Sequence, residues 1–225
     1  MQTPLLAFGR VALDAAGELV APNRCAACDS RIRRRTLFCA SCAVSVIERR
    51  TRYPSRECAV FAYGGAIATA IARCKYGGRP DLAPRLGEMM ATFADSFDGQ
   101  VDVVVSVPLH PRRLADRGFD QAALLARQIA RRLVVPWAPR ALARVHDTPK
   151  QASLDKAARA TNLKGAFVVR TPEAIQGRRV LLVDDVRTTG ATLSGCVTAL
   201  RTTGAEHVWT MVLANRDREE DERTW

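Results

Sequence analysis

Two closely spaced cysteine pairs lie near the start of the chain. Cys25-x2-Cys28 is followed after ten residues by Cys39-x2-Cys42. Each pair can form a tight knuckle, and two knuckles place four thiolates around one tetrahedral metal, for which zinc is the best match. The alternatives are four ordinary reduced cysteines, an iron–sulfur centre or a redox dithiol. A segment this short buries too little apolar surface to fold alone, so we expect a structural zinc.

A second group of chemically active residues follows an apolar run. RRVLLVDDV ends in the adjacent carboxylates Asp184 and Asp185, and a loop of small residues precedes the next predicted helix. The backbone amides of such a loop, together with the positive end of the helix dipole, form a phosphate cradle. The carboxylates can accept hydrogen bonds from sugar hydroxyls or bind metal-ordered water. The alternative is a strand, a turn and a capped helix without a ligand. The loop residues are Thr188, Thr189, Gly190, Ala191 and Thr192.

The elements that must position these residues alternate between strands and helices. The apolar run that begins at residue 101, RRVLLVDDV and HVWTMVLAN are continuous enough to be strands buried on both faces. Such alternation predicts a parallel sheet with helices on its faces, whose ligands bind beyond the carboxyl ends of the strands. Shorter strands are expected at 58–63 and 166–169, and helices at 1–20, 66–75, 81–97, 120–134 and 191–203.

Several strings resemble a known family. VLLVDDVRTTGATL resembles the signature of type I phosphoribosyltransferases. SVPLHPRRLADRGFDQAALLA, RVHDTPKQASLDKAARATNLKGAF and RCKYGGRPDLAPRLG are similar to the ComF family, which includes GntX-like proteins. The resemblance implies an α/β type I phosphoribosyltransferase fold, with an open, mostly parallel sheet flanked by helices and preceded by a small four-cysteine zinc module. We therefore expect an N-terminal segment over 1–57 with a zinc-ribbon-like core at 22–46, an α/β domain over 58–216 and a charged tail over 217–225.

The resemblance also implies a ligand and the roles of individual residues. The ligand is 5-phosphoribosyl 1-diphosphate with magnesium. Asp184 and Asp185 are the catalytic pair that holds the ribose hydroxyls, and the loop from Arg187 to Thr192 holds the 5-phosphate. Candidates for a diphosphate loop after the first sheet strand are Arg112 and Arg113, and candidates in a mobile hood over 146–162 are Lys150 and Arg159.

Two positions depart from the family pattern. Asp120 stands where Asn is usual, although Asp is also a good helix N-cap. Arg187 stands where an apolar or aromatic residue is frequent. Neither change removes the signature, and no residue pattern identifies the acceptor.

Three functions therefore stay open. The first is transfer of the phosphoribosyl group to a nitrogen acceptor. The second is donor binding by a regulatory or adaptor protein that no longer catalyses transfer. The third is nucleic-acid handling through a basic face and the zinc module, for which family membership implies a link to competence and DNA uptake, with DNA or DNA-processing proteins as partners. Arg31, Arg33, Arg34 and Arg35 lie between the knuckles and are either exposed or in contact with nucleic acid.

Composition limits the class of protein. Of 225 residues, 48% are hydrophobic and 25% charged, as in a globular protein, and the net charge of +11 favours anionic partners. Seven cysteines without an export signal argue against a disulfide framework, so Cys58, Cys74 and Cys196 are expected in the core. No apolar run reaches the roughly 18 residues of a membrane span. We expect a cytoplasmic protein.

Overall fold

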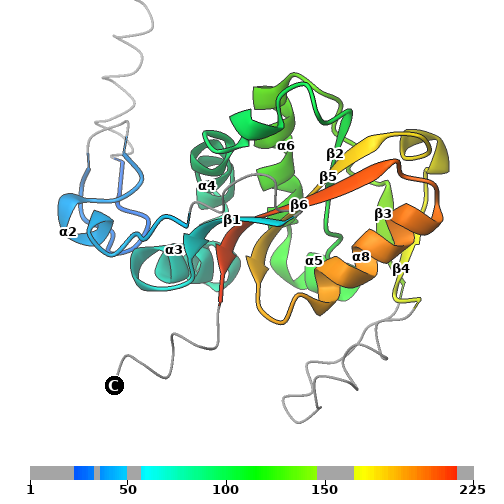
Figure 1. Ribbon diagram of the computed structural model, residues 1–225. Helices are drawn as coiled ribbons and strands as arrows, with labels where there is room; N and C mark the ends of the chain where they lie inside the picture. Colours follow the sequence, from blue (N-terminus) through cyan, green and yellow to red (C-terminus); the bar gives the residue numbers. More distant parts are fainter. Residues whose placement is uncertain (1–22, 33–35, 50–56, 146–164, 217–225) are drawn as a thin grey trace, which may run out of the picture.

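A four-stranded parallel sheet forms the centre of the computed structural model, which describes residues 23–32, 36–49, 57–145 and 165–216 (Figure 1). The strand order is β1-β6-β5-β2. Within it, Ser106 pairs with Val183, and Val183 with Met211. The parallel sheet predicted from the alternation is confirmed. The strands are β1 (Glu57–Ala62), β2 (Val103–Ser106), β5 (Arg179–Arg187) and β6 (His207–Asn215).

Side chains alternate between the two faces of the sheet, and each face has its own hydrophobic core. Along β2, Val104 joins one buried cluster, whereas Val103 and Val105 join the other. Both faces are covered, which explains why the strand sequences are almost continuously apolar. The cluster that includes Val104 also includes residues of α3 (Gly65–Tyr76), α4 (Leu82–Ala91), the 3-10 helix η1 (Ala94–Phe97) and α6 (Gln121–Leu133).

The second cluster lies under α8 (Ala191–Thr202) and a small antiparallel sheet on the opposite side (Figure 1). This small sheet pairs β3 (Leu142–Arg144) with β4 (Phe167–Val169). A 3-10 helix, η2 (Pro172–Ala174), follows β4. β3 was not predicted, because three residues are too few for a periodicity to be visible.

Two further elements differ from the sequence-based expectation. The helix expected over 81–97 ends at Ala91 and is followed by η1. The diphosphate loop was expected to extend from Ser106 through Arg113. In the structure, a helix, α5 (Pro111–Arg117), begins within this stretch. Pro111 is its first residue, a position at which proline is common in helices. Arg112 and Arg113 therefore lie on a helical turn.

The cysteine-rich segment packs directly on the α/β domain. It contains one short helix, α2 (Ala40–Ala43), and its Cys25, Ala26 and Phe38 belong to the same buried cluster as Val104. Arg49 N donates to Val60 O of β1 at 2.8 Å, so the chain continues along the sheet edge before β1 begins. The module shares its core with the domain that follows it.

Some expectations fall outside the described residues. These are the helix over 1–20, Arg33 to Arg35, the hood with Lys150 and Arg159, and the charged tail over 217–225. Among the described helices, none has the length and apolar character needed to cross a membrane.

Candidate functional site

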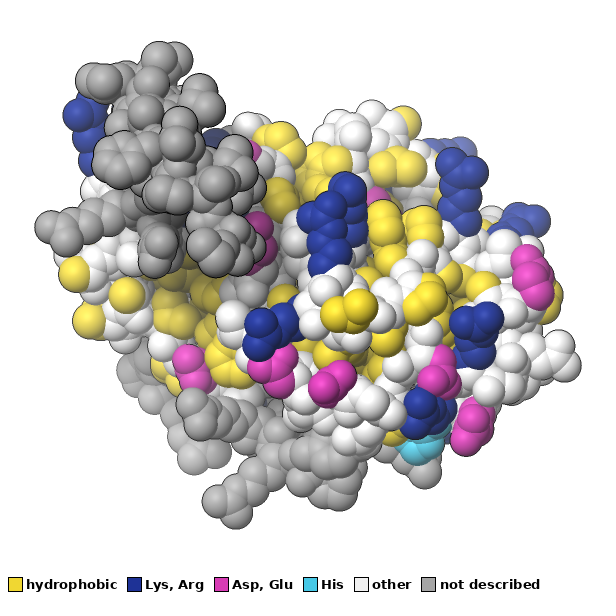
Figure 2. Space-filling model, turned by 90° about the horizontal axis from the view of Figure 1, so that it is seen from above, with side chains coloured by type: hydrophobic (Ala, Val, Ile, Leu, Met, Phe, Trp, Pro, Cys, Tyr) yellow, Lys and Arg dark blue, Asp and Glu magenta, His cyan; other side chains and the backbone are white. Residues whose placement is uncertain are grey.

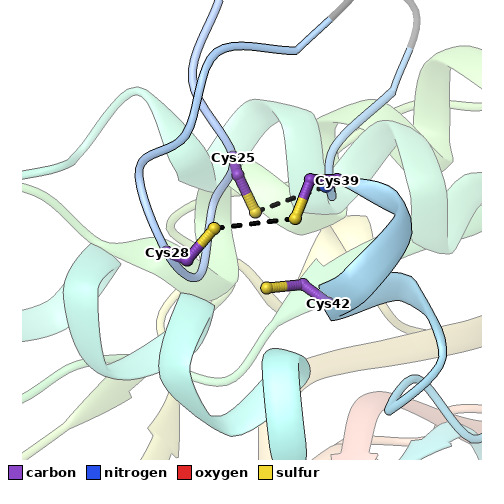
Figure 3. Close-up of side chains that lie close together, drawn as sticks. All are labelled: Cys25, Cys28, Cys39 and Cys42. Atoms are coloured by element: carbon purple, nitrogen blue, oxygen red, sulfur yellow. Dashed lines mark hydrogen bonds between the residues drawn. The ribbon is translucent and has the colours of Figure 1, made fainter.

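The four predicted metal ligands converge on one point (Figure 3). The sulfur atoms of Cys25, Cys28, Cys39 and Cys42 all lie within 4.8 Å of one another, and Cys28 Sγ is 3.6 Å from Cys39 Sγ. Four thiolates bound tetrahedrally to zinc at about 2.3 Å would be separated by about 3.8 Å. The cluster therefore fits a closed four-thiolate zinc site.

Local hydrogen bonds favour the thiolate form of most of these ligands. A hydrogen bond from Ser30 lowers the pKa of Cys28, and the backbone amide of Cys42 lowers the pKa of Cys39. Burial opposes ionisation of Cys25, yet the amides of Cys28 and Cys39 lower its pKa overall. Hydrogen bonding to Cys39 and Cys28 raises the pKa of Cys42 to about 12. A divalent cation at the centre would replace these thiol hydrogen bonds with metal bonds and so favour the thiolate form of Cys42 as well.

A cavity of about 380 Å³ opens at the carboxyl ends of the parallel strands. This is the edge at which open α/β sheets bind their ligands. The lining includes residues that follow β2, β5 and β6, together with residues of α3, α5 and α6. The polar and charged members are Tyr63, Lys75, Tyr76, Arg113, Arg117, Asp120, Gln121, Arg144, Asp184, Asp185, Thr188, Thr192 and Arg216.

Both predicted carboxylates line this cavity. Asp185 is buried, and its Oδ2 lies 2.6 Å from Lys75 Nζ. Among the described residues this oxygen makes no hydrogen bond of regular geometry, so the contact is an ion pair. Asp184 is recessed but retains surface on the cavity, and its Oδ1 accepts a hydrogen bond from Asp185 N at 2.8 Å. Burial and then repulsion from Asp185 raise the pKa of Asp184 well above its ordinary value.

The loop after β5 presents a helix start to the same cavity. Gly190 is the N-cap of α8 and has a φ of 76°, a left-handed conformation that glycine adopts without strain. Its lack of a side chain leaves the N-cap position without a side-chain hydrogen bond to the first helical amides. Thr188 and Thr192 line the cavity, and Thr189 Oγ1 accepts a long 3.5 Å hydrogen bond from Ala191 N.

The predicted arginines separate into two groups. Arg113 lines the cavity, whereas Arg112 is exposed and its amide donates to His110 Nδ1 at 3.3 Å. Arg187 Nη1 lies 2.6 Å from Glu57 Oε2 and lines a different cavity of about 320 Å³ beside β1. Arg113 thus shares the cavity with the carboxylate pair, whereas Arg187 lies beside Gly190 of the loop and pairs with Glu57 in the neighbouring cavity.

Asp120 is a structural member of the cavity wall. It caps α6 by accepting a hydrogen bond from Ala123 N at 3.1 Å, and it also accepts one from Leu109 N at 3.3 Å. Burial raises its pKa. Asp120 therefore stabilises the helix start and the segment after β2 at the same time, as expected of an N-cap residue.

Sequence reasoning did not assign five of the cationic or aromatic residues at this cavity. Arg117 stacks on the Tyr76 ring at 5.3 Å and donates to Gln121 Oε1. The only sequence signal for Lys75 and Tyr76 was the family-like string RCKYGG, which gave no role to either. The five residues are Tyr63, Lys75, Tyr76, Arg144 and Arg216, whereas Arg117 was expected to stabilise the segment after the first sheet strand.

Comparisons with known proteins agree with this architecture. The family model described as phosphoribosyl transferase domain matches residues 82–225. "DNA utilization protein YhgH" of Salmonella typhimurium is 30% identical over 203 residues, which are 82% of this chain and 86% of that protein. "Competence protein F" of Haemophilus influenzae is 39% identical over 114 residues, half of each chain.

The chain is also similar to solved structures. Glutamine phosphoribosylpyrophosphate amidotransferase from B. subtilis, complexed with ADP and GMP, has 24% identity and a TM-score of 0.42. The match covers 63% of this chain and 30% of that one. The family assignment depends on the sequence matches, together with the parallel sheet and the four-cysteine cluster. The chain belongs to the phosphoribosyl transferase domain family, as a ComF-type member whose type I α/β domain is preceded by a four-cysteine module.

Proposed function

We propose that the protein binds 5-phosphoribosyl 1-diphosphate with magnesium in the cavity at the strand ends and transfers the phosphoribosyl group to a nitrogen acceptor. One observation carries the proposal: Asp184, Asp185 and the start of α8 open onto the same cavity, whose wall also includes Arg113 and Arg117. Acidic acceptors for sugar hydroxyls, amides for a phosphate and guanidinium groups for a diphosphate are thereby within reach of one ligand.

The residues present suit magnesium as well. Magnesium in such sites is held by one or two carboxylates together with substrate phosphates, and Asp184 and Asp185 are the carboxylates available on the β5 end. When bound, the metal would neutralise charge on the diphosphate leaving group.

Different side chains and amides of the protein would bind the ribose, the 5-phosphate and the diphosphate. Asp184 and Asp185 orient the ribose, and the α8 amides with Thr188 and Thr192 hold the 5-phosphate. Arg113 and Arg117 stabilise the negative charge that develops on the diphosphate as its bond to ribose C1 breaks. Lys150 and Arg159 stay candidates for contacts from the segment outside the described residues.

Calorimetry with 5-phosphoribosyl 1-diphosphate and magnesium tests the binding site. We expect the double variant Asp184→Asn with Asp185→Asn to lose donor affinity, because the neutral amides accept more weakly from hydroxyls and do not bind magnesium. The exposed Asp98→Asn is the matched control and should bind as the wild type does. Unchanged affinity of the double variant would show that the site is wrongly assigned.

A donor-binding regulator is the alternative on the same site. Release of diphosphate in a screen of nucleobases and amines supports transfer, and tight donor binding with no release under any acceptor supports the regulator. We also propose that the protein acts in the cytoplasm, where thiols stay reduced and available to zinc.

A role in DNA handling is a second candidate function, which can coexist with the first. Two relatives carry the names "DNA utilization protein" and "Competence protein", and the net charge is +11. On the face in Figure 2, however, Lys and Arg side chains stand apart and alternate with Asp and Glu. That face has no continuous basic surface among the described residues, so it adds no electrostatic support beyond the net charge.

A further inference from the structure

The end of helix α3 contacts both the cysteine module and the donor cavity. In Figure 1, α3 lies between the module with α2 and the central sheet. Arg73 and Lys75 are both in its last turn. Because consecutive residues of an α-helix are about 100° apart, two residues separated by one position point to opposite sides. Arg73 faces the module, and Lys75 faces the cavity.

Arg73 holds the first cysteine knuckle by its backbone. Its Nη1 donates to Cys25 O, Ala26 O and Ala27 O at 3.4, 3.4 and 3.1 Å. Its Nη2 lies 2.8 Å from Asp29 Oδ1. One guanidinium thus binds the carbonyls of the knuckle turn and the carboxylate that follows it, a geometry that lysine cannot reproduce.

Just beyond α3, the chain binds the same carboxylate again. Arg79 Nη1 lies 2.9 Å from Asp29 Oδ1, and its Nε donates to Asp81 Oδ1 at 2.8 Å. Gly77 N and Arg79 N both donate to Arg73 O, at 2.9 and 3.3 Å. The last turn of α3 is therefore fixed to the module from both sides of its C-terminus.

On the cavity side, Lys75 pairs with the buried carboxylate of Asp185. Asp184, Asp185 and Asp120 all line the cavity, and Lys75 Nζ pairs with Asp185 Oδ2 at 2.6 Å. The Lys75 side chain is only 18% exposed and that of Asp185 9%, so solvent screens the pair weakly. Without the ammonium, the Asp185 carboxylate would lose the ion pair that holds it in place, and its uncompensated charge would disfavour an anionic donor nearby.

We propose that Lys75 is a positioning residue of the donor site, which holds the Asp185 carboxylate in place. We also propose that the zinc module, through its contacts with Arg73, fixes the position of the helix turn that carries Lys75. The module is then part of the binding site's support, in addition to any role of its own. This inference rests on the proposed function, because a positioning residue needs a ligand to position.

Donor affinity of single variants tests the first half. We expect Lys75→Met to weaken binding of 5-phosphoribosyl 1-diphosphate with magnesium by about tenfold or more, equivalent to about 1.4 kcal/mol. Lys75→Arg keeps the charge and should recover most of the affinity. Melting temperatures show whether each variant is folded. If the wild type binds donor and folded Lys75→Met binds equally well, this inference fails while the proposed function stands; if the wild type binds no donor, both fail.

A double-mutant cycle tests the second half. Arg73→Met should keep its zinc but weaken donor binding, and the effect should vanish in a Lys75→Met background, because Arg73 acts through Lys75. Arg73→Lys is the milder variant if Arg73→Met does not fold. Arg85→Met is the matched control. Arg85 lies on α4, and its Nη2 donates to Thr36 O of the module at 2.8 Å. The variant therefore removes a contact between the module and a helix, but not the contact made by the helix that carries Lys75. Additive effects of the Arg73 and Lys75 variants, or an equal loss of affinity in Arg85→Met, would overturn the coupling.

Discussion

At the residue scale, burial raises the pKa of two carboxyl groups in the cavity wall, those of Asp184 and Asp120. Asp184 is the clearest case, since burial and the neighbouring Asp185 raise its pKa well above the ordinary value of an aspartate. A carboxyl whose pKa is higher in the folded than in the unfolded protein stabilises the fold below its unfolded pKa. That stability is lost as the pH rises through the folded pKa. Ionisation of Asp184 near neutral pH therefore destabilises the folded protein. Hydrogen bonds from a bound ligand to the carboxylate would offset that destabilisation.

Replacing Asp184 alone should separate stability from binding. Asn keeps an oxygen that can accept from Asp185 N but cannot ionise, so we expect Asp184→Asn to melt about 2–4 °C higher at neutral pH, the shift that 1 kcal/mol produces in a domain of this size. The gain should shrink as the pH is lowered toward the ordinary carboxyl range, where the wild-type side chain is also neutral. Thermal melting across pH, with Asp98→Asn as control, measures it. A lower melting temperature at neutral pH would contradict the assigned pKa shift.

At the element scale, the cysteine module depends on its metal and on the helices beneath it. Among its described residues only Cys25, Ala26 and Phe38 are fully buried, and the others are half-buried or exposed, so limited apolar burial holds the knuckles together. Its polar contacts with α3 and α4 include those of Arg73 and Arg85. The module and these helices should therefore lose stability together.

Loss of one thiolate tests that dependence. We expect Cys28→Ser to release zinc and to lower the melting temperature, by about 2–4 °C for each kcal/mol of lost coupling. Cys58→Ser is the matched control, because Cys58 is half-buried in β1 and belongs to no metal cluster of the described residues. Metal analysis and melting curves report both effects. Retention of zinc by Cys28→Ser, or its loss from Cys58→Ser, would contradict the four-thiolate site.

At the scale of the whole molecule, much of the positive charge has internal partners. Arg132 binds Asp95 with two 2.7 Å hydrogen bonds, and Arg179 Nη2 lies 2.7 Å from Asp102 Oδ1. Exposed pairs of this kind add little stability, but they reduce the charge available to an external anion. The net charge of +11 already counts both members of these pairs, and it does not by itself place a basic surface on any face.

The DNA-handling candidate makes a prediction at this scale. If the net charge attracts DNA, affinity for a duplex must fall linearly with salt on a log–log plot, with a slope of about −0.9 for each phosphate neutralised. Fluorescence anisotropy over a salt series measures that slope. Weak binding that does not respond to salt would remove the candidate, without affecting the donor site.

The sequence by itself determined the features that are local in the chain. The spacing of the cysteines predicted their cluster, and the apolar runs predicted the parallel strands, because metal knuckles and buried strands depend on residues close together in sequence. The same holds for the carboxylate pair and the glycine at the start of α8. The family resemblance added the fold type, which the family match confirms.

Only the tertiary structure decided which distant side chains meet. Lys75 reaches Asp185 across 110 positions of sequence numbering, and Arg187, whose guanidinium lies beside Gly190, pairs with Glu57 of β1. The orientation of a long side chain depends on charges and packing supplied by other elements, and neither appears in local periodicity. The link from the cysteine knuckle through Arg73 and Lys75 to the donor cavity is likewise a property of the folded chain, because it requires one helix turn to lie between two sites built from separate segments.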